Sequence, residues 1–441
     1  MRSDKDLKQA NEAVENKWIE EFTTNPADDP ERTMRLRSYL EDIASNHRNG
    51  MSCKLHKAER GGFHYCFVLR FEEDGVQWIF RFPLPGSSFH RHRKTEAELA
   101  VMQFIREKTS IPTPKTIASG VTDGEFKGLG PYILMKYIEG NFLSNLLLDY
   151  KNNDRIRKGI DNSQLRHVYR QIAGIHLDLF AHDFSAIGSL KMEDSETGHI
   201  WRAASEPLTF KLTVTQGMMV GTEIPVSNKP FSSASKYFEH LTSQTLTSLA
   251  ENKTTRLHPE EASKDFNATH LLRSMAQHFA AKIEQMPFKL YCDDLRFGNI
   301  MANDSFDILA IIDLEFTYAA PASFLGSPPW WIVGTEPFEW DDEDKKDYGV
   351  KVDMFIDELE KEEKSRKVEQ THSQFMRQCW SDGSFWYNFA VRECSELKDV
   401  MKLCLDMEPF RSFLQKPSWD TEDDIEKIMS ALGCMKIQPG E

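Results

Sequence analysis

Two patterns of hydrophobic residues divide the chain into a strand-rich region and a helix-rich region. Between residues 51 and 138, short apolar or alternating runs predict strands at 54–59, 64–71, 76–82, 116–121 and 132–137. Residues 94–108 carry apolar positions at helical spacing, and Pro112 and Pro114 stop that helix because proline cannot continue it. The order strand, strand, strand, helix, strand, strand predicts a mostly antiparallel sheet with one helix.

The remainder of the chain is predominantly helical in pattern. Beyond Gly140, helical periodicity occurs at 164–181, 233–250, 269–284, 350–366, 372–380 and 386–405, with one β-hairpin expected from 299–302 and 308–312. Before residue 50, two short amphipathic helices flank the break at 26–30, and Trp18 is expected to anchor this extension. We therefore predict an α+β protein with an extension (1–50), a sheet-bearing lobe (51–138) and a helical lobe (139–441).

Composition and charge argue against several classes of protein function. Of 441 residues, 54 are Lys or Arg and 69 are Asp or Glu, so the net charge is −15, which argues against a general nucleic-acid or anionic-membrane binder. The seven cysteines are scattered without C-x-x-C spacing, which favours reduced thiols over a disulfide framework or a zinc site. No run approaches the roughly 18 apolar residues of a membrane span, and the first residues do not resemble a signal peptide. A cytoplasmic location is expected.

Four polar residues in the helical region carry the candidate chemistry. Asp294 and Asn299 stand in D-x-x-x-x-N spacing after the apolar run 288–292, Arg296 lies between them, and Asp313 follows the predicted hairpin. Phosphoryl transfer needs a carboxylate to orient the attacking hydroxyl, ligands for Mg²⁺ and a cation near the γ-phosphate. One loop can aim Asp294 and Asn299 inward, and the hairpin would return Asp313 beside the Asn299 amide.

The D-x-x-x-x-N spacing alone is a weak signal. About one match is expected by chance in a chain of average composition, and an isolated Asp is usually a solvated loop carboxylate. The approach strand, the hairpin and the carboxylate of Asp313 together favour the functional interpretation.

These motifs resemble the aminoglycoside phosphotransferase-like family, in particular its large fungal branch. The resemblance rests on Asp294-Leu-Arg-x-x-Asn299, Ile-Ile-Asp313-x-Glu315-Phe316, Ala319-Ala-Pro321 and Pro328-Pro-Trp-Trp331, and it extends over roughly Cys53 to Cys404. It implies a two-lobed protein-kinase-like fold in which the nucleotide lies between the lobes.

The resemblance also implies a nucleotide site. Arg81 stands where the family holds the α- and β-phosphates with a basic residue, and Glu98 is its expected partner, with Glu96 as the alternative. A surface ion pair without a role in binding is the competing interpretation. Gly61 and Gly62 fall where a loop would cover the nucleotide, although two glycines can be an ordinary turn. The segment from Lys136 to Ile138 resembles the hinge whose backbone meets adenine.

Several positions depart from the family pattern or have competing interpretations. Cys292 stands where the family often has His; no neighbouring His is available in sequence to activate the thiol, so it is not expected to be a nucleophile. No glycine follows Asp313 in a DFG arrangement and no APE-like segment is visible, which argues against a protein kinase. The basic run 90–94 could be a patch that binds phosphate or a partner, but a solvated loop before the helix is expected. Trp330 and Trp331 could face an acceptor, but at least one is expected to pack between elements.

The leading hypothesis is an ATP- and Mg²⁺-dependent phosphotransferase acting on a hydroxyl of a small molecule. Asp294 would orient or deprotonate the hydroxyl, and Asn299 and Asp313 would hold Mg²⁺. The alternative is a catalytically weak or inactive kinase-like scaffold. The acceptor is expected to bind in the helical lobe, at 191–265 and after Asp313, where the acidic run 336–364 would favour a neutral or cationic molecule unless it is only a solvated helix.

Overall fold

The N-terminal sheet has five antiparallel strands in the order β1-β2-β3-β5-β4 in the computed structural model. The strands are β1 (Cys53–Arg60), β2 (His64–Phe71), β3 (Gln77–Pro83), β4 (Thr116–Val121) and β5 (Pro131–Lys136). Their bounds agree with the expected ranges to within one residue at each end. The register sets Cys66 of β2 opposite Arg81 of β3, and Arg81 opposite Ile133 of β5. Arg81 therefore lies on a central strand of the sheet.

The structure describes residues 30–84, 90–152, 154–196, 198–218, 224–251, 259–393 and 397–406. The first helix expected in the N-terminal extension, with Trp18 and Phe22, lies outside this part of the chain. The second helix is present as α2 (Pro30–Asn46).

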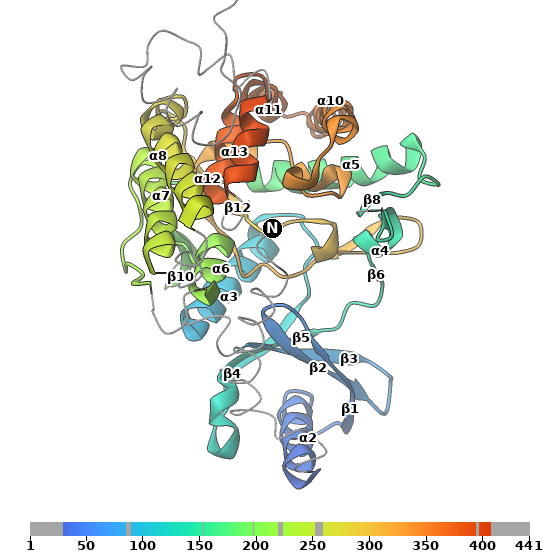
Figure 1. Ribbon diagram of the computed structural model, residues 1–441. Helices are drawn as coiled ribbons and strands as arrows, with labels where there is room; N and C mark the ends of the chain where they lie inside the picture. The colour runs from blue at the N-terminus through green and yellow to red at the C-terminus, as the bar shows by residue number, and fades with distance from the viewer. Residues whose placement is uncertain are drawn as a thin grey trace, which may run out of the picture.

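The two faces of the N-terminal sheet bury different neighbours. One face carries Phe71, Phe80 and Leu134 and packs against Leu40 of α2. The other face, through Ile133 and Met135 of β5, joins the larger core that includes α3 (Arg91–Lys108). Alternation along β5 divides its side chains between these two cores, as expected of a strand covered on both sides. Figure 1 shows α2 on the side of the sheet away from the helical lobe and α3 on the side facing it.

The helical lobe contains the expected long helices and several short ones. They are α4 (Leu143–Leu147), α5 (Asn162–Phe180), α6 (Phe210–Met218), α7 (Ala234–Glu251), α8 (Pro259–Ala281), α9 (Ala322–Gly326), α10 (Asp342–Arg366), α11 (Thr371–Ser381), α12 (Ser384–Arg392) and α13 (Leu397–Asp406). Short 3₁₀ turns occur at Gly124–Leu129, Phe297–Asn299, Trp330–Val333 and Pro337–Glu339. The α+β class is confirmed.

The stretch 386–405, expected as one helix, forms two. Helix α12 ends at Arg392, and the side chain of Lys211 accounts for part of that ending. Its Nζ donates to the carbonyl oxygens of Val391 (2.9 Å) and Glu393 (2.8 Å), which a continued helix would have used internally.

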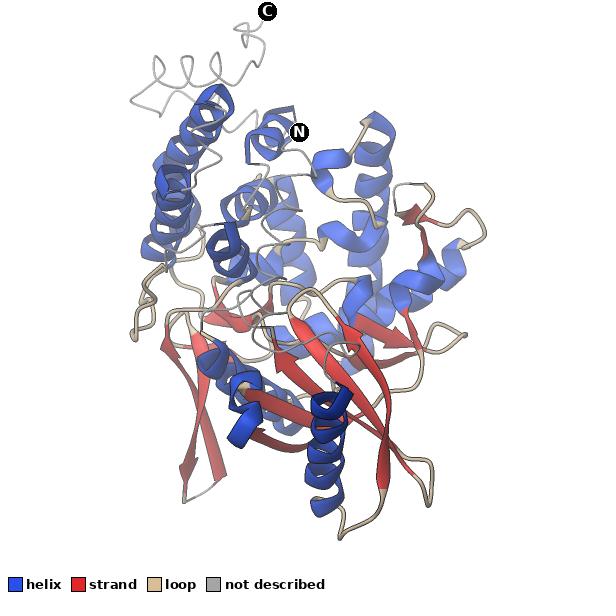
Figure 2. Cartoon of the chain, turned by 60° about the horizontal axis from the view of Figure 1, so that its bottom comes forward, coloured by secondary structure: helices blue, strands red, loops and turns tan. Residues whose placement is uncertain are grey.

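The helical lobe also contains more strands than the single expected hairpin. They are β6 (Asn141–Phe142), β7 (Leu148–Asp149), β8 (Arg155–Ile156), β9 (Asp183–Phe184), β10 (Ser189–Ser195), β11 (Gly198–Ser205), β12 (Phe288–Cys292), β13 (Ile300–Ala302), β14 (Ile308–Ile311) and β15 (Thr317–Ala320). The hairpin of β10 and β11 was missed because few of its positions are buried; Trp201, which packs against Phe104 (ring centroids 5.5 Å apart), is itself only partly buried. Figure 2 shows the strands of the chain in red, most of them on one side of the blue helices.

Candidate active site

The catalytic loop follows the buried strand β12. Asp294 lies two residues beyond the end of that strand, and a 3₁₀ turn at Phe297–Asn299 brings Asn299 back onto it. The side-chain nitrogen of Asn299 donates to the backbone oxygen of Asp294 (2.7 Å) and to its Oδ2 (3.0 Å). Both amide hydrogens are thereby used, so the amide oxygen is the group of Asn299 that can serve a cation.

Asp313 is returned to the loop by the hairpin of β13 and β14. Ile300 pairs with Ile311, and the N–H of Ile312 donates to the backbone oxygen of Asn299 (3.0 Å). Asp313 itself has φ of 60°, in the left-handed region that costs an L-residue about 1–2 kcal/mol. Such a conformation persists where the surrounding structure enforces it, and it is common at functional sites. The hairpin therefore brings the backbone next to Asp313 against Asn299, and the role of the Asp313 carboxylate as a metal ligand stays a prediction.

Arg81 joins the sheet to this segment. Its guanidinium pairs with Glu98 of α3, lies 2.6 Å from Oδ1 of Asp313 and lies 3.0 Å from Nδ1 of His64. The pairing expected between Arg81 and Glu98 is present, whereas Glu96 is exposed. The arginine and glutamate side chains are 10% and 3% exposed, so the surface ion-pair interpretation is wrong for this contact.

The electrostatics of the loop affect the protonation of Asp294. Burial, together with the nearby carboxylate of Asp313, raises its pKa to about 6, although Arg296 opposes the shift. Nε of Arg296 lies 3.1 Å from Oδ1 of Asp294, and its side chain is nearly half exposed. A carboxyl group with this pKa is ionised at neutral pH yet can accept a proton, which suits an orienting or general-base role.

Lys94 is a buried cation that the sequence analysis misplaced. The run 90–94 is not a solvated loop: helix α3 begins at Arg91, and Lys94 is 1% exposed. Its ammonium group pairs with Glu315, two residues after Asp313, and lies 4.2 Å from the centre of the Phe316 ring. The four-residue interval between Lys94 and Glu98 was the available signal, because it puts both on one face of the helix.

Three ligand-type side chains lie close together in this network. One atom each of His64, Asp313 and Glu315 lies within 4.8 Å of the others. Burial raises the pKa of Glu315 and lowers that of His64, while Arg81 and Lys94 supply two cations to the same space. We interpret the group as an ion-pair network, in which Asp313, the most exposed of the three, is the carboxylate available to a metal.

The hairpin between β1 and β2 lies over this network. Gly61 donates its N–H to the backbone oxygen of His64 (2.8 Å), and a Cβ added at Gly62 would meet nothing within 4 Å. The tip residue Phe63 packs its ring against Phe316 (centroids 5.4 Å) and Phe210 (5.8 Å). The two glycines therefore form a small turn beside open space, held to the helical lobe by an aromatic contact.

The expected hinge continues from β5. The N–H groups of Lys136 and Tyr137 donate to the backbone oxygens of Lys115 (2.9 Å) and Gln77 (3.1 Å). Both donors, in the two residues before Ile138, are thus engaged within the N-terminal lobe.

Cys292 is unsuited to nucleophilic chemistry. Burial raises the pKa of its thiol to about 12, so it is protonated at neutral pH.

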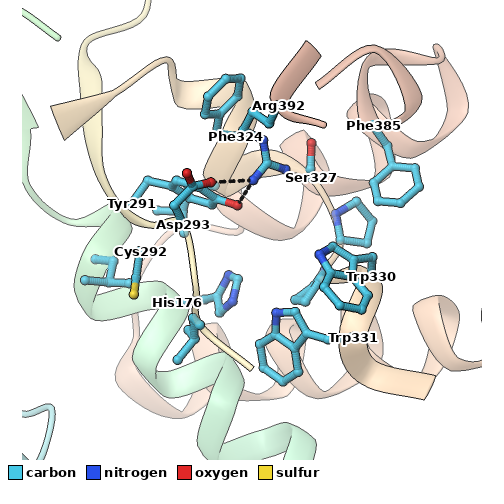
Figure 3. Close-up of a pocket in the computed structure, with 15 residues that line it drawn as sticks. His176, Tyr291, Cys292, Asp293, Phe324, Ser327, Trp330, Trp331, Phe385 and Arg392 are labelled. Carbon is cyan, nitrogen blue, oxygen red and sulfur yellow. Dashed lines mark hydrogen bonds and ion pairs between the residues drawn. The ribbon is translucent and has the colours of Figure 1, made fainter. Parts of the chain in front are cut away.

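The residues expected to face an acceptor have largely structural contacts. Trp331 is buried and packs edge-on against Phe297 (5.1 Å), whereas Trp330 is partly exposed. Both line a small cavity beside the catalytic loop, shown in Figure 3. At the start of the acidic run, Asp341 caps α10 and, with Asp344, binds Arg155 (2.9 and 2.7 Å). These acids are accounted for by helix capping and ion pairing.

Comparison with known proteins identifies the family. A family model described as the phosphotransferase enzyme family matches residues 67–324, more than half of the chain. The chain belongs to this family. Its fold is accordingly the protein-kinase-like fold, with the antiparallel sheet preceding the largely helical region.

Curated relatives match over shorter stretches. A subtelomeric hrmA-associated cluster protein of Aspergillus fumigatus is 31% identical over 134 residues, which are 30% of this chain and 24% of the relative. The mitochondrial protein named altered inheritance of mitochondria protein 9, from Meyerozyma guilliermondii, is 27% identical over 169 residues, 38% of this chain and 26% of the relative. The chain thus covers about a quarter of the length of these relatives.

Solved structures that match this chain share little sequence with it. A thermostable mutant of the aminoglycoside phosphotransferase APH(4)-Ia, in a ternary complex with AMP-PNP and hygromycin B, is 11% identical with a TM-score of 0.42, over 83% of this chain and 97% of that one. Plasmodium vivax ethanolamine kinase is 10% identical with a TM-score of 0.44, over 99% and 96% of the two chains. The family assignment rests on the family model.

Among the described residues, no helix is both long enough and apolar enough to cross a membrane.

Proposed function

We propose that this member of the family is an ATP- and Mg²⁺-dependent phosphotransferase that moves the γ-phosphate to a hydroxyl of a small molecule. The observation that carries the proposal is the convergence of Asp294, Asn299 and Asp313 with the buried pair Arg81–Glu98. Residues 51–138 would bind the nucleotide, and residues 139–441 would carry the catalytic loop and the acceptor site.

The donor atoms suit magnesium. The Asp313 carboxylate and the Asn299 amide oxygen are hard oxygen ligands, the kind that Mg²⁺ prefers. These two residues would hold the ion, which supplies charge neutralisation for the phosphate oxygens when bound.

In this proposal the nucleotide occupies the space between Arg81, the hairpin and the hinge. Arg81 would hold the α- and β-phosphates and Glu98 would keep its guanidinium in place, while Gly61 and Gly62 would cover the phosphates. Because the N–H groups of Lys136 and Tyr137 are bonded within the lobe, the backbone at Ile138 would meet adenine.

Asp294 would orient the acceptor hydroxyl and take its proton, and Arg296 would place positive charge at the transferring phosphate. In this mechanism most of the rate acceleration comes from positioning and electrostatics, because phosphoryl transfer has a loose transition state. The acceptor would approach from the helical lobe. The packing of Phe210, at the start of α6, against Phe316 supports this direction, because it brings the 191–265 segment next to the catalytic segment.

The test is transfer of ³²P from [γ-³²P]ATP or [γ-³²P]GTP to components of a metabolite extract, with Mg²⁺ or with EDTA, and identification of the product by mass spectrometry. We expect Mg²⁺-dependent labelling of a hydroxyl-bearing compound. Nucleotide binding without any transfer or hydrolysis would instead support the scaffold alternative.

A further inference from the structure

Asp293, the residue before Asp294, is a buried carboxylate with no place in the proposed transfer step. Its side chain is 6% exposed, and Oδ1 lies 3.0 Å from Nη1 of Arg392 at the end of α12. The two residues are 99 positions apart in the chain. A buried carboxylate is strongly unfavourable unless it is paired, so the ion pair with Arg392 stabilises this arrangement of the loop.

Arg392 is fixed from several sides. Its Nε donates to the backbone oxygen of Asn388 (2.9 Å), its Nη1 also donates to the hydroxyl of Tyr291, and its guanidinium lies over the rings of Tyr291 (5.0 Å) and Phe324 (4.8 Å). Figure 3 shows Arg392 reaching both Asp293 and Tyr291, with His176 and the two tryptophans across the cavity. The guanidinium therefore has little freedom to move.

The same contact joins the catalytic loop to other elements. The N–H of Asp293 donates to the backbone oxygen of Phe316 (3.1 Å), and the backbone of Phe210, at the start of α6, forms a hydrogen bond with the Asp293 carboxylate. Lys211 of α6 also binds the carbonyl oxygens at the end of α12. The backbone on the N-terminal side of Asp294 is thus held by α6, α12 and the segment after Asp313.

We propose that Arg392 is a positioning residue for phosphoryl transfer: by holding Asp293 it fixes the backbone that aims the Asp294 carboxylate. This inference rests on the proposed function of Asp294. A displacement of about 1 Å at a catalytic group can cost 10²-fold in rate, so loosening the loop is expected to lower kcat. The nucleotide contacts lie elsewhere, so the KM for ATP is expected to stay within about twofold.

The test compares Arg392→Met, Arg392→Lys, Asp293→Asn and the Arg392→Met/Asp293→Asn double variant in Mg²⁺-dependent ATP turnover. Arg392→Met is expected to lower kcat at least 30-fold and Arg392→Lys less, because lysine keeps the charge but loses the planar contacts. The double variant is expected to be no slower than Arg392→Met alone, since both changes break one interaction. If the fold-loss of kcat in the double variant equals the product of the losses in the two single variants, the proposal is overturned.

Arg366→Met is the matched control, because Arg366 forms an ion pair between α10 and α5 with Asp178 (2.6 Å). It is expected to lower thermal stability without changing kcat. An equal loss of kcat in Arg366→Met, or full activity in Arg392→Lys and Arg392→Met, would contradict a positioning role. If Arg392→Met does not fold, the Arg392→Lys comparison decides.

Hydrogen–deuterium exchange of residues 288–300 separates this inference from the proposed function. We expect exchange to be at least tenfold faster in Arg392→Met or Arg392→Lys than in Arg366→Met. Unchanged exchange overturns the loop-holding role. If exchange is faster in the Arg392 variants but the wild type turns over no ATP, Arg392 holds the loop without a role in phosphoryl transfer, and the positioning role is overturned.

Discussion

The guanidinium of Arg81 lies 2.6 Å from the carboxylate of Asp313, although 232 residues separate the two in the chain. One residue lies on the central part of the N-terminal sheet and the other follows the hairpin of the catalytic segment. Because Arg81 also pairs with Glu98, a single side chain connects the sheet, helix α3 and the candidate metal ligand. Nucleotide and Mg²⁺ would have to compete with this contact for both residues.

Replacement of Arg81 is expected to weaken nucleotide binding. Mg²⁺-ATP at one hundred times its Kd should stabilise the wild type by about 2.7 kcal/mol. Arg81→Met should raise that Kd about tenfold or more, which removes about 1.4 kcal/mol of the stabilisation, and Arg81→Lys should have a smaller effect. Thermal-shift titration with Mg²⁺-ATP measures the Kd and the stabilisation in the wild type and in each variant. Arg70→Met, at an exposed arginine on the adjacent strand β2, is the control and should bind normally. A wild-type Kd in Arg81→Met would remove this residue from the nucleotide site.

Replacement of the candidate metal ligands is expected to raise the Mg²⁺ requirement. Asp313→Ala should increase the half-saturating Mg²⁺ concentration at least tenfold and Asn299→Ala less, because a carboxylate binds a hard cation more strongly than an amide does. The measurement is ATP binding or turnover across a Mg²⁺ titration. Asp304→Ala, at an exposed acid between β13 and β14, is the control. An unchanged Mg²⁺ dependence in Asp313→Ala would contradict the assignment.

Two buried histidines are expected to make the fold sensitive to acid. Burial lowers the pKa of His372 to about 4 and that of His176 to about 3, so both are neutral in the folded protein. The unfolded chain takes up protons below about pH 6.5, where these side chains do not. Stability should therefore be lost as pH falls from about 6.5 toward 4, by up to about 1.4 kcal/mol per pH unit for each histidine.

Urea unfolding at pH 7 and pH 5 measures this effect. His372→Gln should reduce the difference in unfolding free energy between the two pH values. His56→Gln, at an exposed histidine of β1, is the control and should leave this difference unchanged. The same pH difference in His372→Gln as in the wild type would show that other groups govern the acid sensitivity.

The sequence was sufficient to predict the sheet, whereas the catalytic and metal-binding roles of Asp294, Asn299 and Asp313 stay predictions. Strands covered on both faces are visible in the sequence as dense apolar runs. The spacing of Asp294, Asn299 and Asp313 can likewise be read directly from the sequence. Pairing across the fold was harder to derive. The burial of Lys94 was missed because its partner, Glu315, is over two hundred positions away. The ion pair between Asp293 and Arg392 likewise depends on how α12 packs, and the local sequence pattern does not show that packing.

Half-buried elements were also missed for a physical reason. In the hairpin of β10 and β11 only Ser189 and Leu190 are buried, and the other positions are partly or fully exposed, so its hydrophobic alternation is faint. The acidic run 336–364 was considered for an electrostatic effect on the acceptor. Near its start, Asp341 and Asp344 bind Arg155 and cap α10, and an effect of the run on an acceptor stays a prediction. Sequence charge alone does not distinguish a capped helix from a substrate-facing surface.

The most direct test of the account is the Asp294→Asn variant, compared with the wild type in single-turnover transfer from [γ-³²P]ATP and in equilibrium binding of ATP. The account predicts that transfer slows by about 10²–10⁴-fold, because Asp294 acts on the acceptor hydroxyl, while the Kd for ATP changes by less than about twofold. Asp342→Asn, at an exposed carboxylate on α10, should behave as the wild type. An Asp294→Asn protein that keeps half of the wild-type rate would contradict the account.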